Sequence, residues 1–147
     1  MMTFAGHLGL ALIVAYILRI DPVLTMAGAV LPDTDVVLSF FFPFEKVHRK
    51  FTHSLLFLLI FGMLSFFFPV LFPVVIGIVT HFIADLDKWG LPLFWPLSSR
   101  HYSLTRISHK HNLSSPQEGV LAWFRKRGPE FWLEWLLLGS GIFLFLK

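Results

Sequence analysis

The chain has 147 residues, of which 56 % are hydrophobic and 14 % are charged, and it carries a formal net charge of +3. A soluble domain holds about 25 % charged residues and, at this size, buries about two-thirds of its surface, so this composition excludes an ordinary soluble domain. The absence of cysteine excludes a disulfide scaffold and a thiolate metal site. We attribute the positive charge to the loops of a membrane protein and expect no nucleic-acid partner.

Five apolar stretches follow one another along the chain, and we expect each of them to be helical. A membrane-spanning helix needs about 17 to 25 residues, which most of these stretches reach. The first carries His7 and lacks a basic start, so we expect a retained helix rather than a cleaved signal peptide. The predicted fold is an all-α, polytopic membrane helix bundle of four to five transmembrane helices, formed by residues 3–20, 22–42, 52–68, 73–88 and 130–147.

Capping residues and prolines mark the helix boundaries. Thr3 is placed to cap the first helix, and Asp21 followed by Pro22 ends this helix and starts the second. The second stretch is interrupted by Leu-Pro-Asp-Thr-Asp at residues 31–35. Because a proline inside a helix breaks the hydrogen-bond pattern, the second stretch is predicted to form two half-helices.

We expect a single integral membrane domain over residues 1–147. Residues 1–90 form its helical core, residues 91–129 a long cytoplasmic or interfacial segment, and residues 130–147 the last helix. Residues 91–96 are too few and too rich in proline to span a membrane, so they are predicted to form an interfacial lid or a re-entrant piece.

Lysine and arginine are distributed very unequally about these stretches. If all five cross, the N-terminus, the 42–52 loop and the 88–130 segment share one side, and the other side retains only Arg19 and Lys147. The positive-inside rule makes the basic side cytoplasmic. We therefore expect a multi-pass protein of the inner or plasma membrane with its N-terminus in the cytoplasm.

Histidines and aspartates lie in or beside the apolar stretches, where ionisable groups are costly and need a partner or a function. Following the chain across the membrane brings all of them to the cytoplasmic half. Four separate segments thus deliver imidazoles and carboxylates to one level, which is the pattern of a metal site. The candidate ligands are His7, Asp33, Asp35, His48, His53, His81 and Asp85.

Simpler explanations compete with this interpretation. His81 and Asp85 lie four residues apart on one helix face, which suits an ion but also suits a hydrogen-bonded pair. Asp33 and Asp35 can cap a kinked helix. His7 can form a hydrogen bond between closely packed helices.

The remaining histidines lie in more polar surroundings. His48 and His53 share a loop with Arg49 and Lys50, so either can simply be solvated. Three later histidines stand in a basic stretch and are not expected to be ligands: His101, His109 and His111.

Nitrogen and carboxylate ligands without sulfur favour Zn²⁺, with Mn or Fe as alternatives, and the number of candidates allows one or two ions. Two ions would activate a bridging water and bind both oxygens of a phosphoester displacement. Arg49 is placed to neutralise a phosphate, and Asp35 or His48, where not a ligand, to act as a general base. Thr52 and Ser54 can supply hydrogen bonds to the ligands.

Four motifs in this order resemble the YdjM-type family of membrane-bound metal-dependent hydrolases. They are His7 in an N-terminal helix, Leu-Pro-Asp-Thr-Asp, His-Arg-x-x-Thr-His-Ser and His-x-x-x-Asp-x-x-x-Trp-Gly, and they cover the chain to about Ser99. The resemblance implies an integral membrane metallohydrolase and supports a site of His7, Asp33, Asp35, His48, Arg49, His53, His81 and Asp85. A looser similarity to zinc-dependent phospholipases C would need Glu130, Glu134 or a late histidine as a further ligand.

We therefore expect a membrane-embedded metal-dependent hydrolase that cleaves a phosphoester of a lipid or membrane-associated substrate, with a metal-activated water at the cytoplasmic interface. Membrane lipids are the expected partners, and the oligomeric state is left open. A transporter or channel for a metal ion or a proton needs the same polar residues, but residues 56–61 and 74–79 are apolar and offer no path onward. A non-catalytic binding or regulatory subunit, whose polar network only fixes helix packing, is the third alternative.

Overall fold

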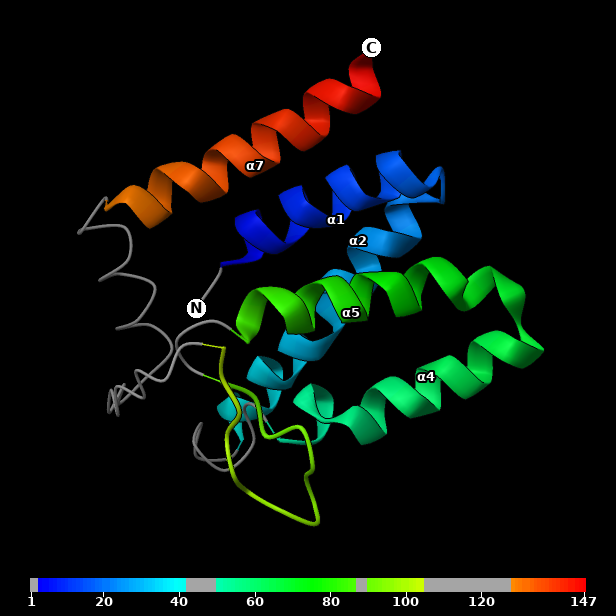
Figure 1. Ribbon diagram of the computed structural model, residues 1–147, viewed down its shortest axis with the longest axis vertical. Helices are drawn as coiled ribbons and strands as arrows, with labels where there is room; N and C mark the ends of the chain where they lie inside the picture. Colours follow the sequence, from blue (N-terminus) through cyan, green and yellow to red (C-terminus); the bar gives the residue numbers. More distant parts are fainter. Residues whose placement is uncertain (1–2, 42–49, 87–89, 105–127) are drawn as a thin grey trace.

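Figure 1 shows the computed structural model, which describes residues 3–41, 50–86, 90–104 and 128–147. These residues form five α-helices: α1 (Phe4–Leu18), α2 (Pro22–Val30), α4 (Leu55–Phe67), α5 (Phe72–Asp85) and α7 (Pro129–Leu146). They also form three 3₁₀ helices: η1 (Leu31–Phe40), η2 (Phe51–His53) and η3 (Pro69–Leu71). The predicted all-α class is confirmed.

Local capping determines where two of the helices begin. The Asp21 Oδ1 atom accepts a 2.8 Å hydrogen bond from the Leu24 N–H, and Pro22 occupies the first helical turn, where its missing N–H is not needed. The Ser54 hydroxyl likewise accepts a 3.3 Å hydrogen bond from the Phe57 N–H at the start of α4. Both starts follow from residues that lie within one helical turn.

The predicted interruption of the second apolar stretch is confirmed. Helix α2 ends at Val30, next to Pro32, and the chain continues over residues 31–40 as the 3₁₀ helix η1. A 3₁₀ helix has about three residues per turn, so Asp33 and Asp35 point to different sides of η1. The half after the break is therefore a 3₁₀ helix rather than a second α-helix.

Glycines allow α2 and α5 to pack backbone against backbone. A Cβ added at Gly77 would lie 2.1 Å from the Thr25 carbonyl oxygen, and one added at Gly28 would lie 2.1 Å from the Val74 carbonyl oxygen. No side chain fits at these distances, so both positions require glycine. The crossing holds α5, which carries two of the candidate ligands, directly against α2.

Helix α7 lies along α1 and runs in the same direction (Figure 1). A Cβ added at Gly9 would lie 2.4 Å from the Leu138 backbone nitrogen, and one at Gly141 would lie 2.9 Å from the Gly9 carbonyl oxygen. Near the C-terminal ends of the two helices, the rings of Tyr16 and Phe145 meet edge to face at 5.8 Å. The first and last helices therefore form a second pair that is packed through glycine.

The segment after α5 returns to the helical core. Leu91 is fully buried in a cluster with Phe57, Val74, Ile78 and Phe82. Its backbone pairs with that of residue 102 through hydrogen bonds of 2.8 and 2.9 Å, which form an isolated antiparallel bridge. The first residues of the predicted interfacial segment thus pack against α4 and α5.

Large apolar side chains are exposed on the outer faces of the helices. Ile17 on α1 is 68 % exposed, Phe66 on α4 is 83 % exposed, and Leu136 on α7 is 64 % exposed. Within the described ranges, no helix combines the length and the apolar character that crossing a membrane requires. The polytopic arrangement stays a prediction.

Candidate metal centre

Four of the predicted ligands come together from three elements. Asp33 lies on η1, His53 on η2, and His81 and Asp85 on α5, and all four side chains are buried. Within the described residues, η1 contacts both η2 and α5. Each residue offers one ligand atom, and these atoms all lie within 4.8 Å of one another. The elements η1, η2 and α5 thus bring their polar side chains to one place.

The distances within this group suit a tetrahedral ion. Ligand atoms about 2.0 to 2.2 Å from a tetrahedral Zn²⁺ lie about 3.3 to 3.6 Å from each other. The His53 Nε2 atom lies 3.2 Å from the His81 Nε2 atom and 3.4 Å from the Asp33 Oδ1 atom. The His81 Nε2 atom lies 3.7 Å from Asp33 Oδ1 and 3.8 Å from Asp85 Oδ2. Four of the six separations are therefore close to the edge lengths of a coordination tetrahedron, and all six lie within 4.8 Å.

The orientation of His81 is determined by the α2–α5 crossing. Its Nδ1 atom lies 2.7 Å from the carbonyl oxygen of Ala29. A carbonyl oxygen only accepts, so Nδ1 carries the proton and donates this hydrogen bond. The lone pair of a neutral His81 is then on Nε2, which faces the other ligand atoms. This is the arrangement of a metal-ligating histidine whose second nitrogen is held by the backbone.

A parallel arrangement orients His53. The Thr52 hydroxyl donates a 2.7 Å hydrogen bond to the Asp35 Oδ2 atom and lies 3.1 Å from the His53 Nδ1 atom. Asp35 Oδ2 also lies 3.6 Å from His53 Nδ1. With Nδ1 directed at two acceptors, the Nε2 atom of His53 presents its lone pair to the group. The hydrogen bond predicted for Thr52 is present, whereas the Ser54 hydroxyl donates to the Phe51 carbonyl oxygen and caps α4.

His7 and Asp35 lie beside the four-residue group. The His7 ring stacks on the His81 ring, with centroids 4.0 Å apart and planes 18° apart. The His7 Nε2 atom lies 3.6 Å from Asp85 Oδ1, while the other oxygen of Asp85 is directed at His81. Asp85 thus presents one oxygen to each of two histidines. The direct ligand roles predicted for His7 and Asp35 stay predictions.

The predicted site residues His48 and Arg49 lie outside the described residues. Of the late histidines, which were not expected to be ligands, His109 and His111 also lie outside them. His101 is exposed, and its Nδ1 atom donates a 3.1 Å hydrogen bond to the Ser99 carbonyl oxygen. The expectation that it is not a ligand stays a prediction.

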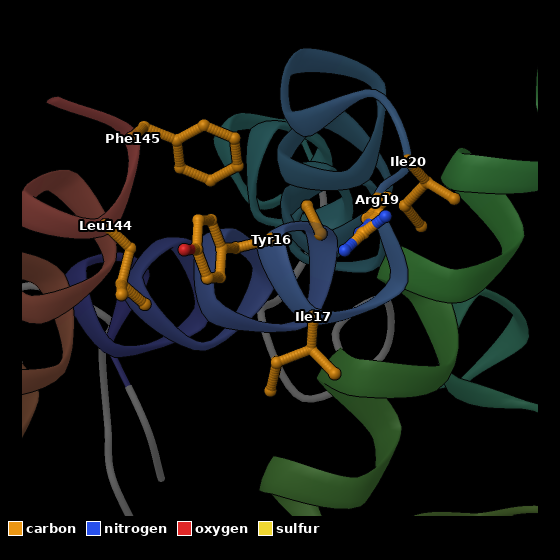
Figure 2. A pocket seen from close by; sticks show the side chains of 7 residues that line it. Tyr16, Ile17, Arg19, Ile20, Leu144 and Phe145 are labelled. Atoms are coloured by element: carbon orange, nitrogen blue, oxygen red, sulfur yellow. The ribbon is translucent and has the colours of Figure 1, made fainter. Parts of the chain in front are cut away.

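A pocket of about 500 Å³ lies at the far end of α1, away from the four ligands. Figure 2 shows it between the C-terminal ends of α1 and α7, with Tyr16, Ile17, Arg19, Leu144 and Phe145 in its wall. The wall is mainly apolar, and Arg19 contributes a guanidinium group. None of the predicted metal ligands lines this pocket.

Glu134 was expected at most to be an additional ligand. It is 3 % exposed on α7, and its Oε2 atom accepts hydrogen bonds from the backbone N–H and the hydroxyl of Thr3. Thr3 directly precedes α1, but its hydroxyl forms no capping hydrogen bond to that helix, so the predicted cap is wrong. An acidic residue between the tryptophans of an apolar helix was the available signal, because such a residue needs a partner.

Fold and site together define the class: an all-α protein with a buried histidine–aspartate group arranged as a candidate divalent-metal centre. The sequence model of the family described as YdjM inner membrane protein matches residues 1–146, and the chain belongs to this family. The resemblance inferred from the motifs is confirmed and extends over nearly the whole chain. Neither curated proteins nor solved structures gave a match.

Proposed function

We propose that this member of the YdjM inner membrane protein family is a metal-dependent hydrolase whose centre is built from Asp33, His53, His81 and Asp85. The observation that carries the proposal is the convergence of these four buried side chains, with their ligand atoms within 4.8 Å of one another. Burying two carboxylates in an apolar bundle is costly unless a cation compensates their charge. A divalent ion is the simplest compensation.

The chemistry of the donors supports zinc as the first candidate. Two imidazole nitrogens and two carboxylate oxygens without sulfur suit Zn²⁺, and Mn²⁺ or Fe²⁺ accept the same set. When bound, such an ion lowers the pKa of a water molecule and polarises a phosphoryl or carbonyl oxygen. The second oxygen of Asp85 is directed at His7, so these two residues are candidate ligands for a second ion beside the first.

The neighbouring residues receive distinct roles in this proposal. Asp35 and Thr52 hold His53 through its Nδ1 atom, which supports an orienting role for Asp35 rather than a role as general base. His48 is then the remaining candidate for the base, and Arg49 the candidate for neutralising negative charge on the substrate. Both follow η1 in the chain and precede η2, the two elements that carry Asp33 and His53.

The proposed substrate is a phosphoester of a lipid or of another membrane-associated molecule. Membership in an inner membrane protein family supports a substrate that is available at the membrane. The exposed apolar faces of α1, α4 and α7 support contact with lipid. The excess of lysine and arginine in residues 42–52 and 88–130 supports a cytoplasmic position for the site.

A second candidate function is favoured by the burial of the site. Four protein ligands complete a tetrahedral Zn²⁺ site, as in structural centres, whereas catalytic centres keep one position open. All four side chains are buried. A centre that only holds η1, η2 and α5 together would correspond to a non-catalytic binding or regulatory protein. Transport of the ion is less well supported, because residues 56–61 and 74–79 are apolar.

Hydrolysis by metal-loaded and metal-depleted protein separates these functions. The detergent-purified protein is reconstituted in vesicles of anionic and zwitterionic phospholipids, and the release of phosphate or of a phosphorylated headgroup is measured. Hydrolase function predicts turnover that chelation abolishes, that Zn²⁺ or Mn²⁺ restores, and that is absent from the variant His81→Ala. If the wild type holds its metal and shows no turnover, while chelation lowers its unfolding temperature, the structural role is correct and the hydrolase proposal is wrong.

A further inference from the structure

A buried carboxylate on the last helix contacts the start of the first helix. Glu134 Oε2 accepts a 3.1 Å hydrogen bond from the Thr3 N–H and a second hydrogen bond from the Thr3 hydroxyl. The two residues are 131 positions apart in the sequence. Only 3 % of Glu134 is exposed, whereas Thr3 is half-buried, so the carboxylate itself is largely shielded from solvent. Hydrogen bonds of this kind, made to a charged acceptor, are stronger than neutral ones.

The position of this carboxylate suits the end of α1. The N–H groups in the first turn of a helix have no partners within the helix, and this end carries a partial positive charge. Helix α1 has no acidic residue in its first turn, and Thr3 forms no side-chain cap to it. Glu134 supplies, from α7, the negative charge that the sequence around α1 lacks. It therefore holds α7 to one specific end of α1.

From this point a short series of contacts leads to the metal centre. The His7 N–H donates a 3.1 Å hydrogen bond to the Thr3 carbonyl oxygen, so His7 lies one helical turn beyond Thr3. The His7 ring stacks on His81 with centroids 4.0 Å apart, and its Nε2 atom lies 3.6 Å from Asp85 Oδ1. Any shift of the start of α1 therefore moves a ring that packs against two of the four ligands.

We propose that Glu134 is a positioning residue that couples the docking of α7 to metal binding through Thr3 and His7. The inference rests on the proposed metal centre and adds a regulatory element to it. Coupling between two binding events is reciprocal, so an undocked α7 weakens metal binding, and bound metal strengthens the docking of α7. A signal or partner that pulls α7 away from α1 would thus weaken metal binding.

The first test compares metal affinities of detergent-purified variants by competition with a chromophoric Zn²⁺ chelator. Glu134→Ala removes both hydrogen bonds, Glu134→Gln keeps an acceptor oxygen without the charge, and Thr3→Val removes the hydroxyl partner. Phe145→Leu is the matched control, because Phe145 also joins α7 to α1 but does so at the far end, against Tyr16. Removing residues that orient metal ligands typically weakens binding by about 10- to 100-fold. Glu134 acts on the ligands only through Thr3 and His7, so we expect a loss near the low end of this range for Glu134→Ala, smaller losses for Glu134→Gln and Thr3→Val, and none for Phe145→Leu.

The second test measures the reverse effect, which a merely structural contact would not produce. Amide hydrogen exchange in α7 is followed with and without Zn²⁺. The proposal predicts that Zn²⁺ slows exchange in α7 of the wild type and of Phe145→Leu to the same extent, slows it less in Glu134→Gln, and has no effect on it in Glu134→Ala. If Glu134→Ala does not fold, Glu134→Gln and Thr3→Val carry both tests.

The outcomes separate this inference from the function on which it rests. A wild type that binds no Zn²⁺ overturns the metal centre itself. A wild type that binds Zn²⁺ as tightly as Glu134→Gln and Thr3→Val, with exchange in α7 independent of the metal, overturns the coupling and leaves the centre in place. Equal losses in Phe145→Leu and Glu134→Ala would also overturn it, because they would reflect general loosening of α7.

Discussion

The two glycine-packed helix pairs, α2 with α5 and α1 with α7, solve the same packing problem with different consequences for the site. In the first pair, Gly28 and Gly77 bring backbones so close that the Ala29 carbonyl oxygen holds the His81 ring directly. In the second pair, Gly9 and Gly141 allow a similar approach, and the N-terminal ends of the two helices are joined by the contact between Thr3 and Glu134. One crossing orients a ligand itself, whereas the other positions a neighbour of the ligands.

The difference indicates how a small helical protein can build a polar centre. Side chains of ligands need fixed orientations, and rigid backbone groups provide them at the lowest entropic cost. The α2–α5 crossing is therefore expected to tolerate little change. The α1–α7 pair acts on the ligands only indirectly, through His7. It is therefore expected to change the metal affinity of the centre moderately, whereas the α2–α5 crossing is needed for the centre to form.

The largest effect on metal binding is expected when a ligand on α5 is removed. His81→Ala removes an Nε2 atom that lies within 3.8 Å of three other ligand atoms. Because loss of an orienting neighbour alone costs about 10- to 100-fold, loss of a ligand should weaken metal binding by more than about 100-fold. The measurement is chelator competition with circular dichroism as a check of helical content. Unchanged affinity in a folded His81→Ala would remove His81 from the centre.

The next effect concerns the glycines themselves. A Cβ at Gly77 would lie 2.7 Å from the Ala29 nitrogen and 2.1 Å from the Thr25 carbonyl oxygen, so Gly77→Ala must push α2 away from α5. Overpacking of this kind costs about 1 to 3 kcal/mol of unfolding free energy, and it should also weaken metal binding because Ala29 holds His81. Thermal and denaturant unfolding in detergent measure the first quantity, and chelator competition the second.

Glycines on the other side provide the comparison and the control. Gly141→Ala places a Cβ 2.9 Å from the Gly9 carbonyl oxygen and should cost less stability than Gly77→Ala, with a smaller loss of metal affinity because it acts on the ligands only through α1. Nothing lies within 4 Å of a Cβ at Gly139, on the same helix, so Gly139→Ala should stabilise the protein by about 0.5 to 1 kcal/mol. A destabilising Gly139→Ala, or a Gly77→Ala that unfolds like the wild type, would contradict the described packing.

A smaller effect is expected for the residue that orients His53. Thr52→Val removes the hydrogen bond to Asp35 while keeping the shape of the side chain. We expect a loss of metal affinity of about tenfold, at the low end for residues that support a ligand, since Asp35 remains near His53 Nδ1. Thr52→Ser should retain wild-type affinity. If Thr52→Val also retained it, the orienting role assigned to the Thr52 and Asp35 pair would be wrong.

Much of the site was accessible to sequence reasoning because it depended on local rules. The interruption at Pro32, the start of α2 at Asp21 and the i, i+4 pair of His81 and Asp85 follow from capping, proline geometry and helical spacing. The approach of His53 to Asp33 was expected from the alternation of helices, and the structure brings their ligand atoms to 3.4 Å.

Other features depended on contacts that no local rule contains. The spacing of Asp33 and Asp35 did not indicate which carboxylate faces the group and which faces Thr52, since this depends on η1 being a 3₁₀ helix. Thr3 has the right identity and position for a cap, yet its hydroxyl is taken by Glu134 on α7. Such a pairing across the chain follows only from the docking of the two helices.

The metal content of the detergent-purified protein tests the central claim most directly. Elemental analysis of the wild type, beside the double variant His53→Ala/His81→Ala purified in the same way, gives the number of ions held by these residues. We predict about one Zn, Mn or Fe per chain in the wild type, or up to about two if His7 and Asp85 hold a second ion, and a background level in the double variant. Equal and substoichiometric metal in both proteins would contradict a metal centre at Asp33, His53, His81 and Asp85.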